Sequence, residues 1–106
     1  MPKYLIQANY VGEGINGLLK EGGSSRRAVA EKLAKSVGGA LEAFYYAFGD
    51  TDLYFIVDLP DNTAAAALVL TINAAGAATC RTTVLMTPEE IDAASKKSPS
   101  YRAPGH

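Results

Sequence analysis

The chain has few of the residues that carry most enzymatic chemistry. Its 106 residues include one Cys, one His and no Trp. A single Cys cannot form an internal disulfide, which favours a reducing compartment. The only His is the last residue, His106, so the core cannot hold a histidine-based metal site or a Ser-His triad. We therefore expect neither a metal nor a cofactor.

A strong charge of either sign and a long hydrophobic run are also missing. Ten Lys and Arg against eleven Asp and Glu leave a net charge of −1, which predicts no binding to nucleic acid or an anionic membrane. The longest uncharged run, between Asp61 and Arg81, is rich in Ala and broken by Thr, Asn and Gly, so it is too weakly apolar to span a membrane. Residues 1–10 turn polar too early for a signal peptide, so we expect a cytoplasmic protein.

What the chain does contain is a regular alternation of strand and helix patterns. Dense β-formers and turn residues predict strands over residues 4–11, 41–48, 53–59 and 79–86. Apolar spacing and caps predict helices over residues 24–37 and 63–75, with a short helical turn around Ile15. The run Thr87-Pro88-Glu89-Glu90 is typical of a helix start and predicts a last, short helix.

The resulting order is β-α-β-β-α-β followed by one helix, which predicts an α+β fold of the ferredoxin-like type. In this plan four antiparallel strands form one sheet and two helices cover one of its faces. We expect a single domain over residues 1–94. Residues 95–106 predict a flexible tail or an arm that docks on a partner.

Both faces of the predicted sheet carry apolar side chains. In the strand 53–59, Leu53, Phe55 and Val57 lie on one face and Tyr54 and Ile56 on the other. The helices cover only one face, so the apolar side chains of the other face would be exposed in a single chain. We therefore predict that a second copy of the chain covers this face, in a homodimer or higher homo-oligomer. The uncharged helix 63–75 leaves two interpretations open: a further contact surface, or a merely Ala-rich surface helix.

Several segments in this order resemble the GYD-domain family of small bacterial proteins. They are Tyr4 to Tyr10, Arg26-Arg27, Gly38-Gly39, Phe44 to Gly49, Leu59-Pro60-Asp61, and Gly76 to Glu90. The similarity covers about residues 3–94. It implies a dimeric α/β-barrel-type assembly of ferredoxin-like subunits and no established biochemical activity.

The chain departs from that family at its signature turn. Gly49 and Asp52 keep the Gly and Asp of the signature, but Thr51 stands where the resemblance predicts Tyr. A role that rests on the Tyr ring therefore stays open. From the residues alone, Asp52 after Gly49 is interpreted as a turn residue.

Polar and aromatic strand residues outline a candidate ligand pocket between two sheets. Its members are Gln7, Asn9, Tyr46, Tyr54, Asp58 and Arg81. The two amides predict a polar lining, because buried amides need hydrogen-bond partners. The aromatic rings either orient an oxyanion or supply packing area. Asp58 is either a general base or a strand-end carboxylate that reaches water, and Arg81 either points into the cavity or lies on an exposed edge.

A second candidate site involves two cations at a helix start. Arg26 and Arg27 lie in the first turn of the predicted helix, where positive charge opposes the helix dipole. Two interpretations stay open: a bound anion or partner carboxylate, or a solvated pair.

No catalytic motif accompanies these candidates. The run Gly12 to Gly17 matches G-x-G-x-x-G only superficially, because 106 residues hold no dinucleotide-binding domain around it. The hypothesis is a homo-oligomeric domain that binds a small organic ligand between sheets. The alternative is a cofactor-independent enzyme, isomerase-like or monooxygenase-like, that acts on a small carbonyl or phenolic compound.

Overall fold

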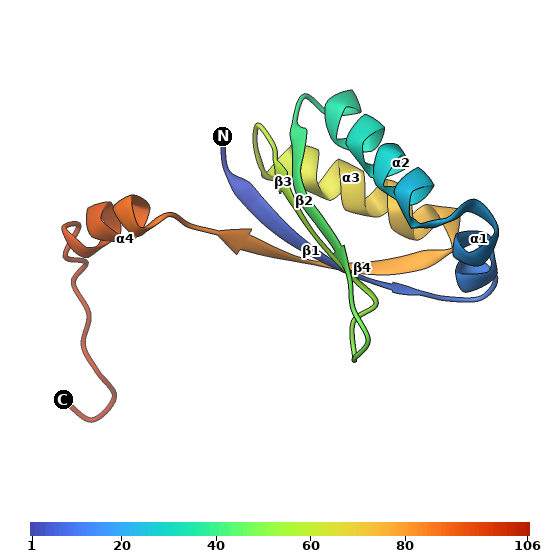
Figure 1. Cartoon of the computed structure of the whole chain (residues 1–106). Helices are drawn as coiled ribbons and strands as arrows, with labels where there is room; N and C mark the ends of the chain where they lie inside the picture. The colour runs from blue at the N-terminus through green and yellow to red at the C-terminus, as the bar shows by residue number, and fades with distance from the viewer.

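The structure, a computed structural model, describes residues 1–106 and contains four strands and four helices (Figure 1). In chain order they are β1 (Lys3–Tyr10), α1 (Gly14–Glu21), α2 (Gly23–Ser36), β2 (Ala40–Tyr46), β3 (Leu53–Asp58), α3 (Asn62–Ala75), β4 (Ala78–Leu85) and α4 (Pro88–Ser95). The predicted order of elements is confirmed. The short helical turn expected around Ile15 is a full helix of eight residues, α1.

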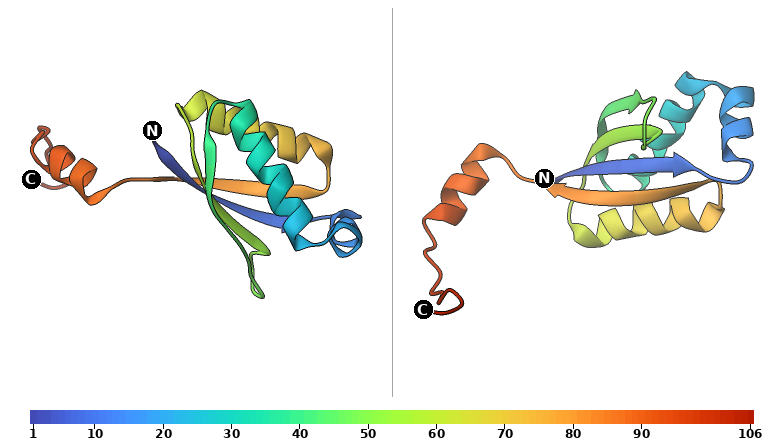
Figure 2. Two further views of the ribbon diagram at one scale, coloured as in Figure 1. Left: turned by 45° about the horizontal axis from the view of Figure 1, so that its top comes forward. Right: turned by 90° about the horizontal axis from the view of Figure 1, so that it is seen from below.

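The four strands form one antiparallel sheet in the order β2-β3-β1-β4. This order is compatible with a ferredoxin-like plait and confirms the α+β class. Helices α2 and α3 both lie against the same face of the sheet, and the opposite face carries no helix (Figures 1 and 2). We call the uncovered side the open face. No helix has the length and apolarity that a membrane crossing requires.

The ends of α3 and α4 follow from local chemistry. The carboxylate of Asp61 accepts a hydrogen bond from the backbone N–H of Ala64 at 2.9 Å and caps α3, which ends at Gly76 with a positive φ of 81°. Helix α4 starts with a complete capping box, in which Thr87 and Glu90 bond each other's backbone N–H groups. Both starts agree with the sequence prediction.

The core lies between the sheet and the helices. Alternate residues of β1 and β3 point into it, as the period of two predicts for strands with one covered face. Two small residues and one leucine of the helices complete it. Its members are Tyr4, Ile6, Ala8, Leu53, Phe55, Val57, Leu59, Ala34, Ala65 and Leu68.

Strand β2 departs from the predicted alternation. Strict alternation over residues 41–48 predicts Leu41, Ala43 and Tyr45 on one face, but a bulge between Leu41 and Ala43 shifts the register. Leu41 now pairs with Val57 and packs against the core, whereas Tyr45 pairs with Tyr54 on the open face. An extra residue in one strand exchanges the faces of every residue beyond it, so strict alternation fails here.

The C-terminal segment extends away from the rest of the chain. Helix α4 stands apart from the sheet and the other helices in all three views (Figures 1 and 2). None of its residues is buried, and Ile91 is 53% exposed. Residues 96–106 contain no further helix or strand.

The buried face of β1 makes a direct test of this core. Ile6→Ala should lower the free energy of unfolding by about 2–5 kcal/mol, because Ile6 is fully buried and its removal leaves a cavity. Ile15→Ala removes the same atoms from the exposed surface of α1 and should cost less than about 1 kcal/mol. Urea unfolding at one protein concentration measures both. Equal losses would contradict the placement of the core.

Candidate functional site

The open face carries a row of four polar and aromatic side chains across the whole sheet. The strand register places Arg81 of β4 opposite Gln7 of β1, Gln7 opposite Tyr54 of β3, and Tyr54 opposite Tyr45 of β2. Directly paired residues of antiparallel strands project to the same side. The sheet therefore brings together three of the predicted pocket residues, Gln7, Tyr54 and Arg81.

A buried threonine joins this row from the loop between β2 and β3. The hydroxyl of Thr51 donates to Gln7 Oε1 at 3.3 Å, and Arg81 Nη2 donates to Thr51 Oγ1 at 2.8 Å and to Gln7 Oε1 at 3.2 Å. Thr51 is only 3% exposed. We call Gln7, Thr51 and Arg81 the polar cluster. Arg81 donates two of the cluster's three hydrogen bonds, and the neutral acceptors Gln7 and Thr51 thereby fix the direction of the Arg81 side chain.

The signature turn holds this loop in place. The Asp52 carboxylate accepts from the backbone N–H of Tyr10 at 3.0 Å, and the backbone N–H of Asp52 donates to Asn9 Oδ1 at 2.9 Å. Asn9 therefore supports the loop beside the polar cluster. Gly49 lies at the tip of the loop, where a Cβ atom would contact nothing within 4 Å. Asp52 and Asn9 thus hold the loop against the end of β1 and place Thr51 in contact with Gln7 and Arg81. We call Asp52 and Asn9 the clamp.

Two of the predicted pocket residues lie elsewhere. Tyr46 projects to the covered side, where its hydroxyl donates to the Gly23 carbonyl at 3.2 Å, because the bulge in β2 sets its direction. Asp58 lies four residues along the register from the row, about 13 Å away. Its carboxylate pairs with Lys3 Nζ at 3.0 Å, and Lys3 also contacts Glu42 at 2.8 Å. The hydrogen bonds that Lys3 donates to the carboxylates of Glu42 and Asp58 raise the pKa of Lys3.

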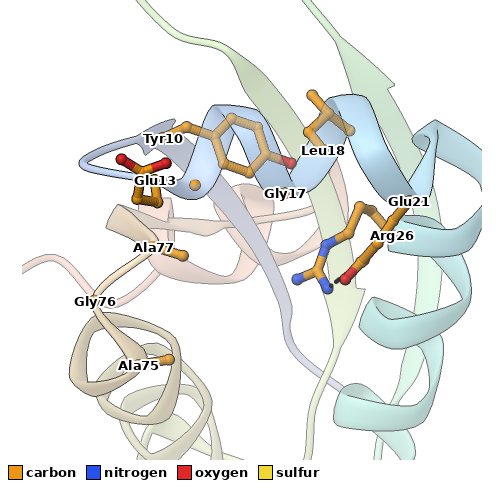
Figure 3. A pocket seen from close by; sticks show the side chains of 10 residues that line it. Tyr10, Glu13, Gly17, Leu18, Glu21, Arg26, Ala75, Gly76 and Ala77 are labelled. Carbon is orange, nitrogen blue, oxygen red and sulfur yellow. Dashed lines mark hydrogen bonds and ion pairs between the residues drawn. The ribbon is translucent and has the colours of Figure 1, made fainter.

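The predicted anion site at the start of α2 contains an internal ion pair. Arg26 Nη1 lies 3.2 Å from a carboxylate oxygen of Glu21 at the end of α1 (Figure 3). An incoming anion would have to displace that carboxylate. Arg27 is exposed and forms no ion pair in the structure. The two arginines therefore do not converge on one site.

A hollow of about 280 Å³ opens beside this ion pair on the helix side (Figure 3). Tyr10, Glu13, Glu21 and Arg26 contribute its polar walls. Burial, together with the neighbouring Tyr46 phenol, raises the pKa of Tyr10 to about 12, while Arg26 lowers it. The phenol stays protonated at neutral pH, so it can donate a hydrogen bond but cannot serve as a base. Two carboxylates in the wall disfavour an anion here.

The thiol of Cys80 is separated from the polar cluster. Cys80 pairs with Ala8 on the covered face, whereas its neighbour Arg81 pairs with Gln7 on the open face. Burial raises the pKa of the thiol to about 11. Since the thiolate is the reactive form, Cys80 is a packing residue at neutral pH.

Thr51 belongs to the candidate site, although the sequence does not predict it there. A residue in a turn has no strand register that predicts the direction of its side chain. The signal was its place beside Asp52, in a loop that returns to the end of β1.

Comparison with known proteins identifies a family for most of the chain. The family model described as GYD domain matches residues 4–95. A comparison with curated proteins finds no match.

The clamp at the signature turn makes a testable contribution to stability. Asp52→Ala should lower the free energy of unfolding by about 1–3 kcal/mol, because it leaves the Tyr10 N–H without its charged acceptor. Asp50→Ala, at an exposed position of the same loop, should change it by less than about 0.5 kcal/mol. Urea titrations compare the two, and an equal effect would show that the clamp is unimportant.

The raised pKa of Cys80 predicts slow alkylation. With a thiol pKa of about 11 against 9.0 for a free thiol, the folded chain should react with iodoacetamide about a hundredfold more slowly at pH 8 than the urea-unfolded chain. The rate for the folded chain should keep rising with pH toward 11. Mass spectrometry follows the modification, and equal rates for folded and unfolded chains would contradict the burial of the thiol.

Proposed function

The chain belongs to the GYD-domain family, and from this membership and its half-covered sheet we propose that it is a homodimer that binds a small organic molecule between two facing sheets. The observation that carries the proposal is the composition of the open face. A sheet face that is apolar and aromatic in its middle does not persist in water without a cover.

The middle of the open face is apolar on every strand except β4, which carries Thr83 there. Leu5 of β1 pairs with Ile56 of β3, and Ile56 pairs with Ala43 of β2. Tyr54 and Tyr45 extend this area and are 38% and 71% exposed in the single chain. A second copy related by a two-fold axis would pack its own open face against this one. Two-fold dimers are the commonest soluble oligomers.

Helix α4 gives independent support for a partner. A helix of eight residues is not stable in water by itself, because nucleation costs more than so few hydrogen bonds return. In a single chain α4 packs against nothing, and it presents Ile91 to solvent. A second copy would supply the surface that α4 lacks.

The groups on the open face favour binding over catalysis. An enzyme that moves protons needs a free base beside its substrate. Of the nearby carboxylates, Asp52 is engaged in the clamp and Asp58 in the ion pair with Lys3. The polar cluster supplies a cation and neutral hydrogen-bonding groups, which recognise a ligand without transforming it. No observation favours the isomerase-like or monooxygenase-like alternative.

Two adjacent threonines of the edge strand β4 provide a matched test of the dimer. Thr83 pairs with Leu5 on the open face, and Thr82 pairs with Ile6 on the opposite side, while both are exposed in the single chain. Thr83→Lys should dissociate the dimer, because it buries an unpaired charge between the sheets. Thr82→Lys should leave the dimer intact.

Analytical ultracentrifugation at micromolar concentration reads out both variants. The wild type and Thr82→Lys should sediment at twice the chain mass of 11.1 kDa, and Thr83→Lys at 11.1 kDa. A wild-type protein that sediments at 11.1 kDa, or a Thr83→Lys variant that stays dimeric, would refute the proposed arrangement.

A further inference from the structure

We propose that the polar cluster binds the carboxylate group of a small aromatic acid through the Arg81 guanidinium. This inference rests on the proposed function, because the ligand lies between the two sheets. It adds to that function the chemical class of the ligand and the residue that recognises it.

Arg81 is the isolated cation of the open face. The other charged groups that project there, Lys3, Asp58 and Glu42, are joined by two salt bridges, carry a net charge of −1 and lie about 13 Å along the strands from Arg81. Arg81 forms no ion pair, and its two acceptors, Gln7 and Thr51, are neutral. A second sheet over this face would remove water from the guanidinium, and a buried cation without a counter-charge is strongly unfavourable. A bound anion supplies the missing charge.

The guanidinium is held in a way that suits a carboxylate. Both of its hydrogen bonds to the protein come from Nη2, so the N–H groups of Nε and Nη1 have no acceptor in the chain. Arg presents its donors as a planar fork that matches the two oxygens of a carboxylate. Because Thr51 is buried and fixed by the loop, the fork is oriented before the ligand arrives.

The neighbouring side chains define the rest of the ligand. Tyr54 lies in the same row two strands from Arg81, which is about 10 Å across the sheet. Leu5 and Ile56 adjoin this row on the next level of the open face. The space between the cation and the tyrosine therefore has Gln7 beneath it and the apolar side chains of Leu5 and Ile56 along one side, and it is as long as a benzene ring with a short carboxylate chain. An aromatic ring bound there can pack against the ring of Tyr54.

The test compares three aromatic acids with their neutral amides: benzoate, phenylacetate and 3-phenylpropionate. Isothermal titration of the wild-type dimer should show at least one acid that binds about tenfold or more tightly than its amide, since a charge-assisted pair is exchanged for a neutral contact. Arg81→Gln should abolish that preference. Arg81→Lys should keep part of it, because Lys retains the charge but not the fork. Arg27→Gln makes the same charge change on α2 and should leave the preference unchanged.

Each contrary result has a distinct meaning. Equal binding of acids and amides, or no binding of either by a dimeric wild type, overturns the inference while the dimer stands. If Arg81→Gln is monomeric, Arg81 pairs with a carboxylate of the second copy, which also overturns it. A monomeric wild type overturns the proposed function and this inference together. The acid-against-amide comparison in the wild type needs no variant, so it decides even where Arg81→Gln does not fold.

Discussion

A sheet has two faces, and here both main helices lie against the same one (Figure 2). The covered face makes an ordinary core, with Ile6, Phe55 and Val57 almost wholly buried. The other face repeats the apolar character of the strands without any cover from the same chain, and Tyr54 and Ile56 lie on it. Since apolar area removed from water contributes roughly 25 cal/mol per Å², a cover over this face would stabilise the fold further. The proposed dimer and the proposed ligand space both depend on this imbalance.

The polar cluster lies beside the apolar middle of that face, and the signature turn builds it. Asp52 and Asn9 fasten the loop to the end of β1, and the loop in turn places the Thr51 hydroxyl against Arg81. Thr51, which stands where the resemblance predicts Tyr, carries its hydroxyl on Cβ, and this short side chain lets the hydroxyl contact both Gln7 and Arg81. A turn that looks purely structural in the sequence therefore also orients the one unpaired cation of the open face.

Regular alternation and local caps made most of the fold predictable. The two faces of β1 and β3, the Asp61 cap and the Thr87 capping box all follow from short patterns that need no tertiary information. Strand β2 did not follow, because a bulge depends on the pairing of two strands and leaves no mark in one of them. For the same reason, only some of the predicted pocket residues lie together. Gln7, Tyr54 and Arg81 share a row set by register, whereas the bulge turns Tyr46 to the covered side and Lys3 engages Asp58.

The shielding of the open face by a second copy is open to direct measurement. Hydroxyl-radical footprinting reports the solvent exposure of individual tyrosines, and the chain offers Tyr45 and Tyr54 on the open face and the exposed Tyr101 in the tail as an internal reference. At micromolar concentration Tyr45 and Tyr54 should be oxidised much more slowly than Tyr101, and dilution below the dissociation constant should remove that protection. If Tyr45 reacts as fast as Tyr101 at every concentration, the open face is in contact with water and no second sheet covers it.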